Sequence, residues 1–167
     1  VVSLRFEGAE SFEDDELAAA IINSETRCPN FVYRAVCWTG LGLERAYLDE
    51  RELEPDALRL RVYYYERGYR NASVDVDTIW QGEDEVEVVF RIEEGRPVRV
   101  AEVEIAGAPE GVARDDLPIR PGGSFDVVAY ESSRDTLLAR LRNNGFARAQ
   151  VLVGYTIAGD DPYHASV

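Results

Sequence analysis

Carboxylates are the side chains with which this chain could most readily do chemistry. The sequence has 32 Asp and Glu residues, 18 Lys and Arg and one His, which gives a formal net charge of −14. Other kinds of enzyme need a nucleophile paired with histidine, a glycine loop that binds phosphate, or regularly spaced metal ligands, and none of these patterns occurs. Gly122-Gly123-Ser124 comes nearest to a phosphate loop, but no lysine follows it. We therefore predict no enzyme and no cofactor, with the acids on solvated faces.

Cys28 and Cys37 are the other residues with chemistry of their own. Together with the lone His164 they are too few for a closed zinc site, which takes four ligands, so no metal is predicted. Two interpretations remain open: a disulfide in an oxidising compartment, or two unpaired small core residues in a reducing one. A bridge would close a short loop and stabilise the fold by about 2 to 3 kcal/mol.

The net charge narrows the range of partners. Attachment to phosphate backbones or to anionic lipid needs clustered Lys and Arg, which the net charge of −14 opposes, so we predict no nucleic-acid partner. No apolar run approaches the roughly 18 residues of a membrane helix. Because the chain lacks methionine and begins in a strand-like run, we expect it to be a segment of a larger protein.

A repeated phrase divides the chain into two units. Residues 66–74 (ERGYRNASV) and 143–151 (NNGFARAQV) each place a glycine, an aromatic residue and then a strand-like run in the same order. Gly68 and Gly145 fit the left-handed residue just beyond a helix, so each phrase predicts a helix end followed by a strand. The spacing from the first strand gives the first unit roughly 22 additional residues, which we assign to an insertion near 24–50 that holds both cysteines.

Apolar periodicity predicts the order strand, helix, helix, strand, strand for the first unit. Its strands are expected near 2–6, 74–79 and 86–92, with one helix after Ser11 and a second that begins at Pro55. The residues expected on the inner faces of these helices are Leu17, Ile21 and Ile22 in the first and Leu58, Val62 and Tyr65 in the second.

The second unit is expected to repeat this order. Its first strand spans 98–105, with a bulge or bend between Val100 and Val103 where the apolar phase slips. A short helix is expected at 113–117, and Asp126 can cap a longer one. A strand follows from Val151 to Ile157, and we expect the sequence to end inside the last strand, which begins near 163. The inner face of the longer helix is expected to hold Tyr130, Leu137, Leu138 and Leu141.

The ordered phrases at 65–74, 86–95 and 98–107 resemble tandem POTRA domains, the periplasmic modules of outer-membrane protein assembly factors such as BamA and TamA. The resemblance spans nearly the whole chain. It implies an α+β fold of two consecutive β-α-α-β-β domains, at 1–95 and 96–167, each a three-stranded mixed sheet covered by two helices. The insertion near 24–50 is a departure from the usual compact domain.

For function, the resemblance implies a non-catalytic periplasmic arm of a Gram-negative outer-membrane protein, followed in the full-length protein by a C-terminal membrane β-barrel. Such an arm handles unfolded outer-membrane proteins or accessory lipoproteins. An open sheet edge can receive an extended peptide as an added strand, although acids on the edge can also protect it from pairing. By analogy with POTRA sheets, the peptide-binding edge falls on Ser73, Val74, Asp75, Val76 and Asp77, and on Gln150, Val151, Leu152 and Val153.

The resemblance bears on three further points. In an oxidising periplasm, Cys28 and Cys37 are expected to form a disulfide. Tyr63 and Tyr64 belong to the densest aromatic cluster and either pack inside the protein or form a surface for a partner protein. Two alternative functions are the POTRA region of a two-partner secretion transporter and a division-type periplasmic scaffold, against which the tandem repeat argues.

Overall fold

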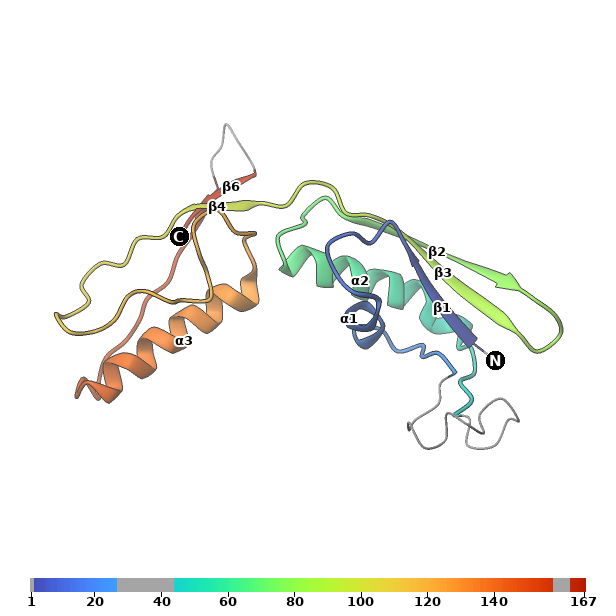
Figure 1. Cartoon of the computed structure of the whole chain (residues 1–167), viewed down its shortest axis with the longest axis horizontal. Helices are drawn as coiled ribbons and strands as arrows, with labels where there is room; N and C mark the ends of the chain where they lie inside the picture. The colour runs from blue at the N-terminus through green and yellow to red at the C-terminus, as the bar shows by residue number, and fades with distance from the viewer. Residues whose placement is uncertain (1, 27–43, 158–162) are drawn as a thin grey trace. The chain divides into compact units, whose positions relative to one another are not determined.

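The computed structural model describes residues 2–26, 44–157 and 163–167 of the chain (Figure 1). Contacts divide the chain into two units, one formed by residues 1–63 and 72–94 and the other by residues 64–71 and 95–167. Each unit contains a three-stranded mixed sheet. The predicted α+β fold with two such sheets is confirmed.

The sheet of the first unit has the strand order β1-β3-β2. Its strands are β1 (Val2–Glu7), β2 (Ser73–Trp80) and β3 (Val86–Glu93). The central strand β3 pairs in parallel with β1 and antiparallel with β2. Helices α1 (Asp14–Ala19) and α2 (Leu53–Glu66), with the short 3₁₀ turn η3 (Glu50–Glu52) before α2, lie on one side of this sheet (Figure 1). The predicted order of strands and helices is confirmed for this unit.

The core of the first unit lies between the sheet and its helices. The inward residues of β3, among them Val88 and Phe90, are buried, and Val89 in the opposite phase is buried as well. The Phe6 ring stacks on Phe90 with centroids 5.5 Å apart. From the helices, Leu17 and Leu60 are fully buried as well. The inward side chains of β3, which recur every second residue, thus pack against helix side chains that recur every three to four residues.

The inner faces of both helices differ from the prediction. In α2 the expected residues Leu58, Val62 and Tyr65 are 56%, 47% and 51% exposed, and the buried positions are Asp56, Ala57, Leu60 and Tyr64. The predicted face was wrong because two apolar stripes run along this helix. The stripe that packs against the sheet is the one that contains Ala57 and Leu60. Helix α1 ends at Ala19, and Ile22 is 58% exposed. The Ile22 N–H donates to the Asp56 carboxylate at 2.8 Å, which takes Ile22 out of the expected inner face.

The second unit has a smaller sheet with the strand order β4-β6-β5. Its strands are β4 (Arg99–Glu102), β5 (Thr156–Ile157) and β6 (His164–Ser166). The register of β4 against β6 shifts between Val100 and Glu102, which confirms the predicted irregularity. The core of this unit is a cluster of Val98, Val100, Ile119, Phe125, Tyr130 and Ala165.

One helix of the second unit forms as predicted and another does not. Helix α3 (Val127–Asn143) begins at Asp126, whose carboxylate accepts the N–H groups of Val128 and Ala129 at 2.7 and 3.1 Å. The short helix expected at 113–117 is absent. The Arg140 guanidinium binds the carbonyl oxygens of Ala113 and Asp115 at 3.0 and 2.6 Å, so these oxygens serve a side chain instead of a helical turn.

The repeated helix ends have the same geometry. Gly68 and Gly145 have φ angles of +94° and +92°, as predicted for the left-handed residue beyond a helix. In the first copy Gly68 N–H donates to Tyr65 O and Tyr69 N–H to Tyr64 O; in the second Gly145 N–H donates to Arg142 O and Phe146 N–H to Leu141 O, all at 2.9 to 3.1 Å. Both copies are therefore Schellman motifs, in which the glycine lets the chain turn away.

Alanine substitution should distinguish the two glycines. A Cβ at residue 68 would lie 2.9 Å from the Phe125 carbonyl oxygen and 3.3 Å from that of Val98, within the same unit, whereas nothing lies within 4 Å of a Cβ at residue 145. We expect Gly145→Ala to cost about 1 to 2 kcal/mol through its positive φ. Gly68→Ala should cost at least about 1 kcal/mol more, because backbone must move.

Urea unfolding followed by circular dichroism measures both losses. Amide exchange at Val98, whose N–H donates to Gly68 O at 2.8 Å, gives a local readout that Gly145→Ala should leave unchanged. Equal losses of stability in the two variants would contradict the close packing at Gly68.

Candidate functional site

Strand β2 lies at an edge of the first sheet. It pairs with β3 on one side, and no strand of the described part of the chain pairs with its other side. The predicted edge residues Ser73, Val74, Asp75, Val76 and Asp77 all lie in β2. The structure thus brings this predicted set together on an open edge, while peptide binding there stays a prediction.

The register identifies the backbone groups that face the open side of β2. Gln81 N–H donates to Glu85 O at 2.9 Å, in line with the antiparallel pairs of β2 and β3. Hydrogen-bonded positions alternate along such a pair, so the odd-numbered residues of β2 direct their backbone groups to β3. The residues that direct N–H and C=O to the open side are therefore Val74, Val76, Thr78 and Trp80.

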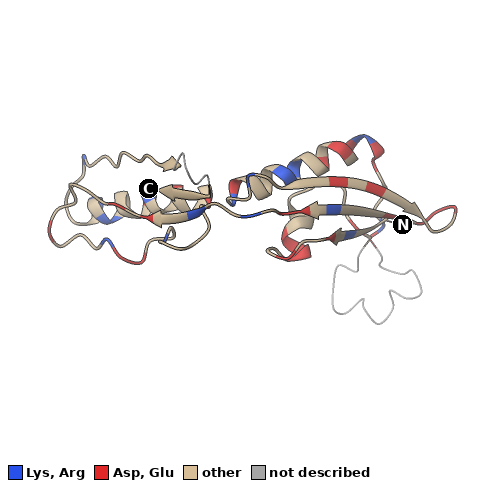
Figure 2. Ribbon diagram, turned by 90° about the horizontal axis from the view of Figure 1, so that it is seen from above, with Lys and Arg blue, Asp and Glu red and all other residues tan. Residues whose placement is uncertain are grey.

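Acidic and basic residues lie along the strands of this sheet (Figure 2), and several of them form ion pairs on its outer face, the face opposite to Val88 and Phe90. The ion pairs are Arg91–Asp77 at 3.1 Å, Arg91–Glu7 at 3.7 Å, Arg5–Glu7 at 3.3 Å and Arg5–Glu87 at 3.2 Å. Exposed pairs of this kind add little stability individually. Their main consequence is positional, because Arg91 on β3 holds the Asp77 carboxylate beside the edge.

The Asp77 carboxylate also contacts the edge itself. Its Oδ1 accepts the Thr78 N–H at 2.8 Å, while its Oδ2 accepts from Arg91 at 3.1 Å. The hydrogen bond from Thr78 and then the one from Arg91 lower the pKa of Asp77 below its usual value, despite a small opposing effect of burial. Asp77 is therefore ionised at neutral pH, and it occupies one of the outward donors of β2.

The opposite edge of the sheet is covered where β1 begins. Thr26 N–H donates to Val2 O at 2.8 Å, and Val2 N–H donates to Thr26 Oγ1 at 3.3 Å. Thr26 Oγ1 also accepts the Ala46 N–H at 3.0 Å. Thr26, near the start of the insertion, thus closes this part of β1 and is held by Ala46 near its end, so β2 is the more accessible of the two edges.

The second predicted edge is not a strand. Gln150, Val151, Leu152 and Val153 have no strand pairing, and β5 consists of Thr156–Ile157 alone. The expected strand from Val151 was too long because β6 offers three residues, of which only two pair with β5. The four residues line a groove of about 420 Å³, together with residues 103–108 and side chains of α3. Leu152 is 93% exposed.

The tyrosine cluster divides between core and surface. Tyr64 is fully buried and packs edge-on against Tyr69 with centroids 5.7 Å apart, so it cannot form part of a partner surface. It is buried because it follows Leu60 by one helical turn. Tyr63 is half-buried and packs against Phe12 at 5.2 Å, and it remains a partly accessible candidate.

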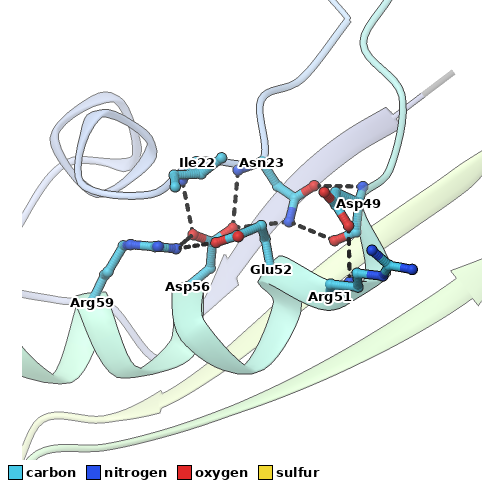
Figure 3. Close-up of polar contacts among 7 residues, drawn as sticks. All are labelled: Ile22, Asn23, Asp49, Arg51, Glu52, Asp56 and Arg59. Carbon is cyan, nitrogen blue, oxygen red and sulfur yellow. Dashed lines mark hydrogen bonds and ion pairs between the residues drawn. The ribbon is translucent and has the colours of Figure 1, made fainter.

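Buried Asp56 organises the base of the insertion, and the sequence reasoning missed it (Figure 3). Its carboxylate accepts the Ile22 N–H at 2.8 Å, the Asn23 N–H and side-chain amide at 2.9 Å each, and Arg59 at 2.6 Å. Asn23 in turn exchanges hydrogen bonds with the Asp49 backbone at 3.0 and 3.2 Å. Residues 23 and 49, at the two ends of the insertion, are thereby tied together. Cys28 and Cys37 lie outside the described residues, and their disulfide stays a prediction.

The buried position of Asp56 affects its ionisation in opposite directions. Burial by itself raises the pKa of Asp56, but the hydrogen bonds from Ile22, Asn23 and Arg59 together lower it more. The net pKa lies below the usual value, so Asp56 is charged at neutral pH and fully paired. The only signal in the sequence was the position of Asp56, an acid just after Pro55 in the first turn of a helix. An acid at that position is equally typical of a solvent-exposed helix start.

Together these features define a class of protein: modules with a three-stranded mixed sheet, helices packed against it and an open edge strand. The sequence profile of POTRA, described as surface antigen variable number repeat, matches residues 1–95 and 98–164. The chain therefore belongs to the POTRA family.

Several solved structures are similar to this chain. POTRA domains 3–5 of BamA from Haemophilus influenzae are 18% identical with a TM-score of 0.46, over 99% of this chain and 63% of that one. POTRA domains 1–2 of the periplasmic domain of Omp85 from Anabaena are 13% identical with a TM-score of 0.41, over 99% and 89%. CdiB from Escherichia coli is 15% identical with a TM-score of 0.39, over 99% and 26%.

These likenesses are remote, and the profile match carries the family assignment. The chain spans less than two thirds of the BamA fragment, at 63% of its length. No curated protein matches the chain. Within the described ranges, no helix is long and apolar enough to cross a membrane, and no group of three or more His, Cys, Asp or Glu side chains is placed to hold a metal ion.

Asp56→Asn should weaken the first unit in a pH-dependent way. Asparagine has one acceptor oxygen and cannot satisfy the donors of Ile22, Asn23 and Arg59, so we expect a loss of about 2 kcal/mol at pH 7. Because the folded pKa of Asp56 is depressed, its ionised form stabilises the protein above the unfolded value of about 3.9, and this stabilisation is lost as pH falls through the folded pKa.

Urea unfolding between about pH 7 and pH 3 checks this, with Asp75→Asn as the matched control. Asp75 is exposed on β2, and its substitution should change stability by less than about 0.5 kcal/mol. A loss in Asp56→Asn that stays constant down to the lowest pH would contradict the role of the charged carboxylate.

Proposed function

We propose that the chain is a non-catalytic binding and scaffolding arm in the periplasm, the soluble part of an outer-membrane β-barrel protein of a Gram-negative bacterium. Its clients are unfolded outer-membrane proteins, which bind as an added strand along β2. The observation that carries the proposal is the row of outward backbone groups on Val74, Val76, Thr78 and Trp80. Membership of the POTRA family supports the periplasmic location and the attachment to an outer-membrane protein.

Strand addition suits a client that is unfolded and variable in sequence. The hydrogen bonds come from main-chain groups that every residue except proline supplies, so the edge needs no particular side chain. Extended segments of a barrel precursor already alternate between apolar and polar residues. Such a segment would continue the pattern of β2, where Val74 is buried and Asp75 is exposed.

Charge adds a preference to this sequence-tolerant binding. The outward-facing side chains of β2 include Asp75 and Asp77, and the turn after it carries Glu83, Asp84 and Glu85. A client strand with Arg or Lys on its solvent-facing side would find opposite charges across the new pair. At the end of β2, Trp80 is 55% exposed and offers an apolar contact.

Other partners follow from the same setting. Accessory lipoproteins and the chain's own C-terminal membrane β-barrel belong to this proposal, with an assembly factor of the BamA or TamA type as the whole protein. The groove lined by Gln150, Val151, Leu152 and Val153 is a second place where an extended segment could lie. A two-partner secretion transporter is the alternative whole protein, and it would use the same edge.

Peptide titration followed by nuclear magnetic resonance tests the proposed site. The probe is a peptide of about ten residues with alternating Val and Thr and a Lys at each end. We expect amide shifts at Val74 and Val76 and none at Val2 and Ser3 of β1. Val76→Pro should weaken binding about fivefold, because it removes an outward donor but no hydrogen bond between β2 and β3.

Val153→Pro is the matched control, since it makes the same substitution in the groove of the second unit. Binding lost in Val153→Pro and kept in Val76→Pro would move the site to the groove. The absence of any shift at millimolar peptide would count against strand addition altogether.

The proposed disulfide has its own test. Thiol titration of the unreduced, unfolded protein should find no free sulfhydryl if Cys28 and Cys37 are bridged, and two after reduction. Reduction should also lower the free energy of unfolding by about 2 to 3 kcal/mol. Two free sulfhydryls in protein isolated from an oxidising compartment would overturn the bridge.

A further inference from the structure

We propose that Asp77 acts as a gate on the edge of β2: its carboxylate occupies the Thr78 N–H and limits how far an added strand can pair. This inference rests on the proposed function, since it concerns how the same edge is regulated. It assigns to Asp77 a role that its neighbour Asp75 does not share.

The geometry of Asp77 carries the inference. Thr78 is one of the four residues of β2 whose backbone groups face the open side. The Asp77 Oδ1 takes the Thr78 N–H at 2.8 Å, at the place where an incoming carbonyl oxygen would bind. The other oxygen of the same carboxylate is bound by Arg91 of β3 at 3.1 Å. Both oxygens are therefore engaged, and the second contact holds the first in place.

The gate divides the edge into two parts. An incoming strand meets the outward donors of Val74 and Val76 without competition from Asp77. To continue to Thr78, its carbonyl oxygen must displace a charge-assisted hydrogen bond, which is stronger than the neutral one that replaces it. The strand therefore binds the first half of β2 readily, and it binds the second half only by displacing the Asp77 carboxylate from the Thr78 N–H.

Asp75 provides an internal comparison. It lies on the same strand and the same outer face, two residues away, and it is exposed as Asp77 is. Asp75 lies opposite Arg91 in the register of β2 and β3, yet the Arg91 guanidinium forms its ion pairs with Asp77 and Glu7. Removing either acid changes the charge of the edge equally, but only removal of Asp77 frees the Thr78 donor.

The test uses the same alternating Val and Thr peptide on four variants of the chain. Asp77→Ala should bind it about three- to tenfold more tightly, with a new amide shift at Thr78. Asp75→Ala removes the same charge from the edge but frees no donor, so it should weaken binding of the Lys-ended peptide by about twofold and not tighten it. Asp77→Asn keeps an acceptor oxygen and should fall between wild type and Asp77→Ala. In the double variant Asp77→Ala with Thr78→Pro the gain should vanish, because residue 78 then has no N–H.

The outcomes separate the gate from the proposed function. Equal tightening by Asp77→Ala and Asp75→Ala would show that charge alone matters and would overturn the gate. So would wild-type affinity in Asp77→Ala, or a gain that survives in the double variant. Binding seen only in Asp77→Ala would support the gate as a closed edge. No binding by any variant, each confirmed as folded by its amide spectrum, would overturn the gate and the proposed function together.

Discussion

The structure depends on one constraint of small sheets: only the central strand can satisfy its backbone on both sides. In the first unit β3 is that strand, and it bonds β1 on one side and β2 on the other. Both outer strands then carry unpaired backbone groups, which a protein must cover, protect or use. Thr26 covers the beginning of β1. On β2 the Asp77 carboxylate accepts one outward N–H, that of Thr78. The difference between the two edges is what makes β2 the candidate binding site.

The same constraint explains why the insertion matters to the first unit. Thr26, near the start of the insertion, covers β1, and Ala46, near its end, donates to the Thr26 hydroxyl. The nearby residues Asn23 and Asp49 are hydrogen-bonded to each other, and Asn23 is also bound to the buried Asp56. Burying a carboxylate is costly unless every partner is present, and here backbone, amide and guanidinium donors supply them. The polar cluster thus fixes the ends of the insertion to helix α2.

Much of this fold could be predicted from residues whose local chemistry leaves few options. Gly68 and Gly145 predicted the two helix ends, and Asp126 predicted the start of α3. The alternation along β3 predicted a strand with a buried face. The prediction was wrong where residues distant in sequence determine the packed face of a helix or the conformation of a segment. The inner face of α2 depends on which of two apolar stripes meets the sheet, and 113–117 is not helical because Arg140 captures its carbonyl oxygens. The edge position of β2 was foreseen by analogy. The role of Asp56 and the contact of Asp77 with Thr78 could not be predicted, because acids are common throughout this sequence and no local pattern distinguishes these two.

The central claim is that an extended chain adds to the open side of β2. The most direct measurement is a set of isotope-filtered nuclear Overhauser effects between unlabelled peptide and labelled protein. The account predicts cross-strand contacts from the peptide backbone to the amide protons of Val74 and Val76, in the alternating pattern of a sheet. Contacts confined to the exposed face of α2 around Leu58 and Val62, or to Leu152 in the groove of the second unit, would contradict it.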